Sequence, residues 1–152
     1  MEQTYVMVKP DGVQRGLVGR VIQKFEDKGL QLVGLRMRWP NQELLKEHYA
    51  ALADKPFFDD LLDYVGSGPV VCMCWRGREA VKEARRLIGA TDPCQAAMGS
   101  IRGDLGQVAG RNLIHGADSV ASAAREIALW FSDGEDLVCN WSSALQPWLL
   151  DH

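Results

Sequence analysis

The chain contains three histidines, and His115 has the most chemical potential among them. It follows a short apolar pair and precedes Gly116, so it stands between an expected strand and an expected helix. A neutral imidazole is nucleophilic near pH 7. By position alone, however, a histidine there is more often a structural hydrogen-bonding group. The others are His48, inside an amphipathic segment, and His152, at the end of the sequence.

Arginines gather in the sequence around this histidine. Arg102 and Arg111 belong to the stretch that leads to His115, and Arg85 and Arg86 end the helix expected before it. Arginine presents a planar fork of N–H donors that suits a phosphate group. The net charge of −3 argues against a surface built mainly to neutralise a nucleic-acid backbone. Any phosphate site must therefore be concentrated, and nucleic acid is not expected as the main ligand.

Two familiar kinds of site are missing from the sequence. No G-x-x-x-x-G-K-[ST] loop occurs, and Gly12, Gly16 and Gly19 do not match the dinucleotide-binding fingerprint. If nucleotides bind, they use another scheme. Cys72 and Cys74 form a C-x-C pair in an apolar segment, without a histidine at the spacing of a zinc site, so buried thiols are the better interpretation.

Alternating strands and helices must position these residues. Apolar or alternating runs that end at turn signals predict strands over residues 4–9, 30–39, 70–75 and 113–114. Apolar residues at helical spacing predict helices over residues 17–28, 42–52, 57–65, 78–88 and 120–131. The sequence predicts a turn at residues 10–12 and a long loop at residues 89–112.

This order favours a split β-α-β arrangement. We expect an α+β fold, an α/β sandwich of the ferredoxin-like type, in which helices pack on a four-stranded antiparallel sheet. The 152 residues predict a single domain, 1–152, whose tail 132–152 packs on the body or on a neighbouring subunit. No secretory signal and no membrane span are recognised, so we expect a cytoplasmic protein without a membrane partner.

The octapeptide N-L-I-H-G-A-D-S around His115 closely resembles the histidine signature of nucleoside diphosphate kinases. Six further segments are similar to segments of that family in the same order. They are Val8–Gly19, Lys46–Tyr49, Lys55–Phe58, Ser67–Val71, Ile101–Asp104 and Glu126–Phe131. The resemblance covers roughly residues 3–131, and the number of co-linear motifs argues against chance.

The resemblance implies reversible transfer of the γ-phosphate from a nucleoside triphosphate, typically ATP, to a nucleoside diphosphate through a phosphohistidine. His115 is implied as the phosphate acceptor and Glu126 as the carboxylate that orients it, with Lys9 and Tyr49 also in the catalytic set. The nucleotide-binding residues implied are Lys9, Phe57, Leu61, Arg85, Thr91, Arg102, Ala109 and Asn112. Phe57 is implied to stack on the base, which predicts broad base specificity and a role in maintaining NTP and dNTP pools.

The resemblance also implies partners and departures. Mg²⁺ is the implied cofactor, carried by the nucleotide phosphates and not by a protein metal site. The family forms homo-oligomers, and we expect a hexamer in preference to a tetramer. Ala117 replaces the usual serine, Lys55 a common arginine, and Ala109 a bulkier aliphatic residue.

Two other functions remain open at this stage. A catalytically silent module could keep the fold and dock partners or single-stranded nucleic acid, although the presence of His115 and Arg102 argues against it. An RNA binder of the RRM type would need aromatic strands and a basic sheet, which the predicted strands do not supply.

Overall fold

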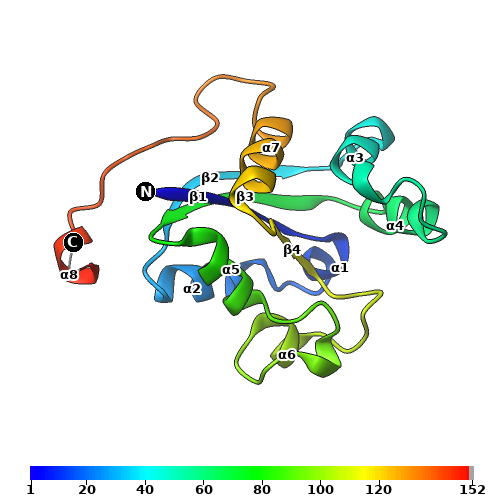
Figure 1. Ribbon diagram of the computed structural model, residues 1–152, viewed down its shortest axis with the longest axis horizontal. Coiled ribbons are helices and arrows are strands. Elements are labelled where there is room, and N and C mark those ends of the chain that lie inside the picture. The colour runs from blue at the N-terminus through cyan, green and yellow to red at the C-terminus, as the bar shows by residue number, and fades with distance from the viewer. Residues whose placement is uncertain (151–152) are drawn as a thin grey trace.

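The computed structural model describes residues 1–150 and shows a four-stranded sheet with helices on both faces (Figure 1). The strands are β1 (Glu2–Val8), β2 (Gln31–Arg38), β3 (Val70–Gly77) and β4 (Ile114–Gly116). Their order is β2-β3-β1-β4, and every neighbouring pair is antiparallel. The predicted α+β, ferredoxin-like class is therefore confirmed.

Helices fill the connections between the strands. In chain order they are α1 (Pro10–Gln14), α2 (Val18–Asp27), α3 (Gln42–His48), α4 (Phe58–Val65), α5 (Ala80–Ile88), α6 (Ile101–Leu105), α7 (Val120–Trp130) and α8 (Gln146–Leu149). Two single 3₁₀ turns complete them, η1 (Ala50–Leu52) and η2 (Pro93–Gln95).

Both faces of the central strand β1 are buried, which explains its continuous apolar sequence. Tyr5 and Met7 join the cluster under α3, α4 and α7, and Val6 and Val8 join the cluster under α2 and α5. Figure 1 shows these two helical layers on opposite sides of the sheet. Each side chain buried in this way contributes on the order of 1.5–3 kcal/mol. The sheet therefore gives the short strand β4 a rigid neighbour.

Three local predictions were wrong. The turn predicted at residues 10–12 is the start of α1, because proline is well suited to the first position of a helix. The helix predicted over 42–52 ends at His48 and continues only as η1. The loop predicted over 89–112 contains η2 and α6, and α6 is capped by the Ser100 side chain, which accepts a hydrogen bond from Gly103 N. Helices this short carry too few apolar residues to show a period.

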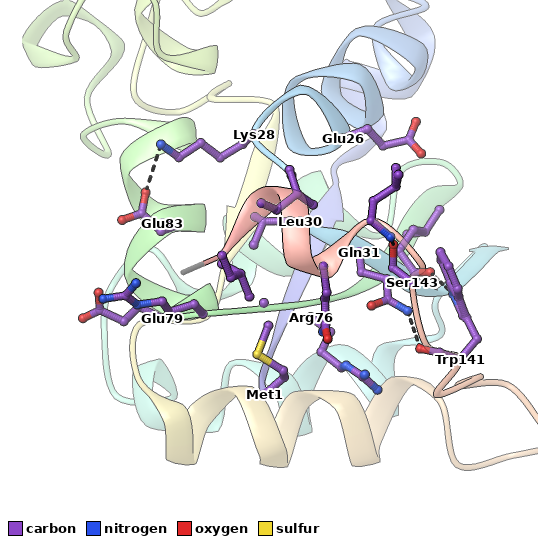
Figure 2. A pocket seen from close by; sticks show the side chains of 18 residues that line it. Met1, Glu26, Lys28, Leu30, Gln31, Arg76, Glu79, Glu83, Trp141 and Ser143 are labelled. Atoms are coloured by element: carbon purple, nitrogen blue, oxygen red, sulfur yellow. Dashed lines mark hydrogen bonds and ion pairs between the residues drawn. The ribbon is translucent and has the colours of Figure 1, made fainter. Parts of the chain in front are cut away.

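The tail leaves α7 and returns along β2. Cys139 N donates to Val33 O at 2.7 Å, and Trp141 Nε1 donates to Leu32 O at 2.9 Å. A cavity of about 480 Å³ lies between this tail and the body. Figure 2 shows its wall, including the Lys28 side chain and its ion-pair partner on α5. None of the site residues predicted from the sequence lines this cavity, and His152 lies outside the described residues.

Candidate active site

His115 lies in the middle of β4, where it pairs with Met7 of β1. Its side chain therefore faces the layer that contains α7, and Glu126 approaches from that helix. His115 Nε2 and Glu126 Oε1 are 2.7 Å apart. The side chains are 19% and 7% exposed, so the pair is largely shielded but the histidine can still be reached.

The surroundings keep the His115 ring neutral. Burial lowers its pKa to about 3, and the positive charges of Lys9 and Arg102 act in the same direction. Burial also raises the pKa of Glu126, while His48 and Arg125 oppose that shift. Because a carboxylate only accepts hydrogen bonds, the ring donates its Nε2–H to Glu126. The lone pair then lies on Nδ1, which makes Nδ1 the nucleophilic atom.

Lys9 stands at the junction of β1 and α1, next to the strand that carries His115. Its backbone N–H donates to Leu113 O at 2.9 Å, and its Nζ donates to Asn112 Oδ1 at 2.9 Å. Asn112 Nδ2 in turn donates to Thr91 O at 3.1 Å. Burial and the charge of Arg102 lower the pKa of Lys9 to about 8. The ammonium group is therefore held in place by an amide and is still protonated at neutral pH.

Arg102 is buried and joins three backbone segments. Its guanidinium donates to Asn112 O at 3.3 Å, to Gly89 O at 3.2 Å, and to Ile114 O. Burial and the nearby Arg85 lower its pKa to about 10, which leaves it charged at neutral pH. Arg102 thus fixes the backbone on the approach to His115 while adding positive charge to the site.

The residue two positions before His115 has an unusual backbone conformation. Leu113 has a φ of 60°, in the left-handed region, although it is not glycine. Such a residue costs on the order of 1–3 kcal/mol, and here its full burial holds it in place. A Cβ on Gly12 would lie 2.9 Å from Leu113 O, so glycine allows α1 to pack closely here. The strained turn sets the direction in which β4 begins.

Arg85 adds a third cation to the site, and Tyr49 adds a neutral hydroxyl. Arg85 lies in the last turn of α5, and its guanidinium donates to Gly116 O at 3.3 Å. Tyr49 is 9% exposed, and within the described residues its hydroxyl is buried without a hydrogen-bond partner. Burial raises the pKa of that hydroxyl, so it stays protonated. The Tyr49 ring lies 4.5 Å, centre to centre, from the ring of His48, and the unpaired hydroxyl is a donor that a ligand can satisfy.

The residues expected around the base lie in a different setting. Phe57 immediately precedes α4 and is 49% exposed, whereas Leu61, one turn later, is half-buried. Ala109 is exposed in the loop before β4. Arg111 joins this loop to α4, because its guanidinium lies 4.4 Å from the centre of the Tyr64 ring. The loop and the helix are therefore neighbours at one side of the site.

Three other residues singled out in the sequence, Arg86, Lys55 and Ala117, have surroundings of other kinds. Arg86 pairs with Glu83 on its own helix, and Lys55 is exposed. Ala117 lies two residues after His115, just past the end of β4, and is fully buried in the cluster that contains Met7, the β1 partner of His115, so it lies on the same side of the sheet as His115. No motif or spacing connects His48 with His115, yet the centres of the two rings are 4.7 Å apart.

Comparisons with known proteins agree with this geometry. The family model for nucleoside diphosphate kinase matches residues 2–135. The chain is 54% identical over 151 residues to the chloroplastic nucleoside diphosphate kinase 2 of Nicotiana tabacum, covering 99% of this chain and 64% of that protein. It is also 53% identical over 151 residues to nucleoside diphosphate kinase B of Flaveria bidentis. That match covers 99% of this chain and 100% of that protein.

A solved structure extends the likeness to three dimensions. The nucleoside diphosphate kinase of Halobacterium salinarum, determined in complex with CDP, superimposes with a TM-score of 0.95 at 48% identity. The match covers 99% of this chain and 99% of that one. The chain spans less than two thirds, 64%, of the tobacco protein's length. Within the described residues, no helix is long and apolar enough to cross a membrane.

Proposed function

The chain belongs to the nucleoside diphosphate kinase family, and we propose that it transfers the γ-phosphate of a nucleoside triphosphate to a nucleoside diphosphate through a phosphohistidine on His115. One observation carries the proposal. A neutral imidazole donates its Nε2–H to Glu126 at 2.7 Å, which leaves the Nδ1 lone pair free beside a group of fixed cations. This arrangement suits an attack on phosphorus.

The reaction consists of two matched displacements. In the first, Nδ1 of His115 forms a bond to the γ-phosphorus, and the bond from that phosphorus to the β–γ bridging oxygen breaks. The electron pair leaves with that oxygen as the nucleoside diphosphate departs. In the second, a terminal phosphate oxygen of another nucleoside diphosphate attacks the phosphorus and the N–P bond breaks. The ring returns to its starting form, and the kinetics are ping-pong.

The cations act on the transferred group. Phosphoryl transfer has a loose transition state with charge spread over the peripheral oxygens, so positioning and positive charge provide most of the catalysis. Lys9, Arg85 and Arg102 supply that charge, and Tyr49 supplies a neutral donor. Thr91 and Asn112 complete the set around the phosphates and sugar, and the hydrogen bond from Asn112 to Lys9 supports that placement. Glu126 stabilises the developing positive charge on the ring.

The base rests on the exposed side of the site. Phe57 offers one aromatic face, and Leu61 and Ala109 offer apolar contacts near it. Stacking does not depend on the identity of the base, because every base has a π-face. The enzyme therefore accepts purine and pyrimidine nucleotides and serves to maintain NTP and dNTP pools.

The divalent cation enters with the substrate, and Mg²⁺ is the natural one. Within residues 1–150, the one group of metal-ligating side chains is His48, His115 and Glu126. Two imidazoles and a single carboxylate do not fit Mg²⁺, which prefers oxygen ligands and phosphates. The nucleotide phosphates therefore hold the ion, and the protein binds the complex through its cations.

The chain assembles into a homo-oligomer, with a hexamer preferred. β2 is an edge strand, and Leu35 and Met37 on it are 50% and 62% exposed, as is Trp39, just past its end, at 69%. Leu35 and Met37 pair with β3 residues of the cluster under α2 and α5, so they continue that apolar face beyond its helices. Such a stripe on an edge strand is suited to a second copy. Light scattering should give about 101 kDa for six chains of 16.9 kDa, against about 68 kDa for four.

A cytoplasmic location remains our proposal for this chain. Its curated relatives include a chloroplastic form, so location differs within the family. Fractionation of the source cells with an antibody to this chain tests it directly. Recovery with an organelle fraction would contradict the proposal.

The decisive experiment for the activity traps the intermediate. The purified protein is incubated with γ-labelled ATP and Mg²⁺, and the label on the protein should be acid-labile, base-stable and removed by an added nucleoside diphosphate. His115→Ala should carry no label while it keeps the wild-type melting temperature to within a few degrees. A wild-type protein without label, or a His115→Ala protein that still carries it, would show that the proposal is wrong and would favour a catalytically silent module.

A further inference from the structure

His48 is a buried histidine to which the reaction above assigns no role. It ends α3, is 4% exposed, and accepts a hydrogen bond at Nδ1 from Trp130 Nε1 at 2.9 Å. Trp130 is itself fully buried at the end of α7. Because indole nitrogen can only donate, His48 Nδ1 must carry a lone pair. Burial and the nearby His115 lower the pKa of His48 to about 3, so the ring is neutral and its proton lies on Nε2.

The fixed ring of His48 stands against the reacting ring. The two imidazole centres are 4.7 Å apart with an angle of 76° between the planes, so one ring presents its edge to the face of the other. Ligand-type atoms of His48, His115 and Glu126 all lie within 4.8 Å of one another. Tyr5 lies 6.0 Å from His115 and stacks on Trp130 at 5.8 Å. The His115 ring is therefore enclosed by His48 and Tyr5, with Glu126 on its Nε2.

The two helices that carry these groups are joined to each other. Arg125, next to Glu126 on α7, donates to Glu47 O and His48 O at 3.1 Å each. Those carbonyls belong to the end of α3, where they have no partner within the helix. α3 and α7 therefore hold the ring of His48 and the carboxylate of Glu126 in a fixed relation.

We propose that His48 is a positioning residue, which blocks rotation of the His115 ring so that Nε2 stays on Glu126 and Nδ1 stays directed to the nucleotide. The consequence for catalysis rests on the proposed function, but the positioning itself does not. A histidine ring can rotate about its Cβ–Cγ bond, and a half-turn exchanges the sides of the two nitrogens. The His48 ring occupies part of the space beside His115 that this rotation would need.

A bound metal is the other role that these three residues suggest. Imidazole binds a metal through a nitrogen lone pair, and the Trp130 hydrogen bond occupies the one lone pair that neutral His48 possesses. A metal on either nitrogen would therefore break that buried hydrogen bond. Lys9, Arg85 and Arg102 also oppose an added dication near His115. The geometry thus favours positioning.

The test compares two buried substitutions on α3. His48→Asn keeps an acceptor near the position of Nδ1 for Trp130 but removes the ring beside His115. Leu45→Ala removes a fully buried side chain from the same helix without touching the site. Both should lower the melting temperature, but only His48→Asn should slow phosphorylation of His115, by roughly 10–100-fold in kcat with KM within about twofold.

A second readout does not depend on activity. In ¹⁵N-labelled wild-type protein, His115 should show one tautomer with its proton on Nε2, and in His48→Asn it should show a mixture. An unchanged tautomer, or an equal loss of kcat in Leu45→Ala, overturns the inference. If the wild-type chain forms no phosphohistidine, the proposed function fails while the tautomer still decides this question. If His48→Asn does not fold, Trp130→Phe replaces it in the test. This variant keeps the rings of His48 and His115 but removes the hydrogen bond to His48 Nδ1, and the same measurement of the His115 tautomer should again show a mixture.

Discussion

The two ends of the proposed nucleotide site are built in opposite ways. At the phosphate end, Lys9, Arg102 and Asn112 are 7%, 7% and 5% exposed and are hydrogen-bonded to one another or to the backbone. At the base end, Phe57 is 49% exposed and Ala109 lies in an exposed loop. One end is rigid before the substrate arrives, and the other is open.

This difference matches what varies among the proposed nucleotide substrates. Every nucleotide brings the same phosphates, so fixed donors can be placed in advance and lose little entropy on binding. The bases differ in size and in hydrogen-bonding edges, and a site that read those edges would reject most of them. An exposed aromatic side chain can stack on any base without distinguishing one base from another. Damage to the buried end should therefore lower kcat, and damage to the open end should raise KM.

The largest effect is expected at the buried end with Glu126→Ala. Loss of the carboxylate removes the group that fixes the His115 tautomer, so single-turnover phosphorylation should slow by about 10²–10³-fold with KM within threefold. Glu126→Gln is the matched control, because its side-chain oxygen can still accept the Nε2–H at a similar position. It should lose no more than about tenfold. Equal losses in the two variants would show that orientation is not the role of Glu126.

The next largest effect is expected in the pH dependence of kcat/KM, and it also concerns the buried end. The pKa of Lys9 is lowered to about 8, so the side chain is charged below that pH and loses its charge above it. The value of kcat/KM for the triphosphate should therefore fall above about pH 8, by about tenfold per pH unit, because this ratio reports groups of the free enzyme.

Lys9→Arg provides the control for the fall of kcat/KM above about pH 8. Arginine remains charged throughout, so the alkaline fall should disappear even if the absolute rate is lower. If kcat/KM of Lys9→Arg still falls at the same pH, the titration of another group causes the fall.

At the open end, Phe57→Ala should raise KM roughly tenfold with kcat within twofold, since stacking contributes about 1–3 kcal/mol per base. The rise should be similar for purine and pyrimidine diphosphates. The melting temperature should change little, because half of this side chain is already exposed. Phe57→Tyr keeps the ring and should behave like the wild type. A large fall in kcat would remove the distinction between the two ends.

The residues of the open end could not be predicted from spacing, because Phe57, Leu61 and Ala109 came from the family resemblance and Ala109 belongs to a different segment from the other two. The longer helices could be predicted because their apolar residues recur at helical spacing over several turns, as in α2, and β3 could be predicted from its continuous apolar run. α1 and α6, at five residues each, are too short to show a period. The role of Arg102 as a link between three carbonyls could not be read from its neighbours, because those carbonyls belong to other segments.

The hydrogen bond between Trp130 and His48 is a clearer case of a contact that sequence patterns cannot predict. Its spacing on an amphipathic segment predicts only that one side of the helix is buried. Its partner Trp130 is 82 residues away, and nothing local marks either residue for the other. The His115–Glu126 pair is only 11 residues apart, yet that pair too came from the family resemblance and not from spacing. Sequence patterns report secondary structure, whereas contacts across the sheet depend on how its layers close.

The smallest effect is expected from Ala117→Ser, which tests how complete the buried end is. Ala117 is fully buried just past the end of β4, on the same side of the sheet as His115, so a hydroxyl there would lie near the ring and the Glu126 carboxylate. A hydrogen bond to that charged group would contribute about 1 kcal/mol or somewhat more. We expect kcat to rise about twofold and the melting temperature to rise by roughly 2–4 °C.

Ala117→Val is the matched control for this substitution, because it adds volume at the same buried position without a hydroxyl. It should lower the melting temperature and leave kcat no higher than in the wild type. If Ala117→Ser leaves both kcat and the melting temperature unchanged, the missing serine has no consequence in this chain. The buried end would then already be complete with the groups that it has.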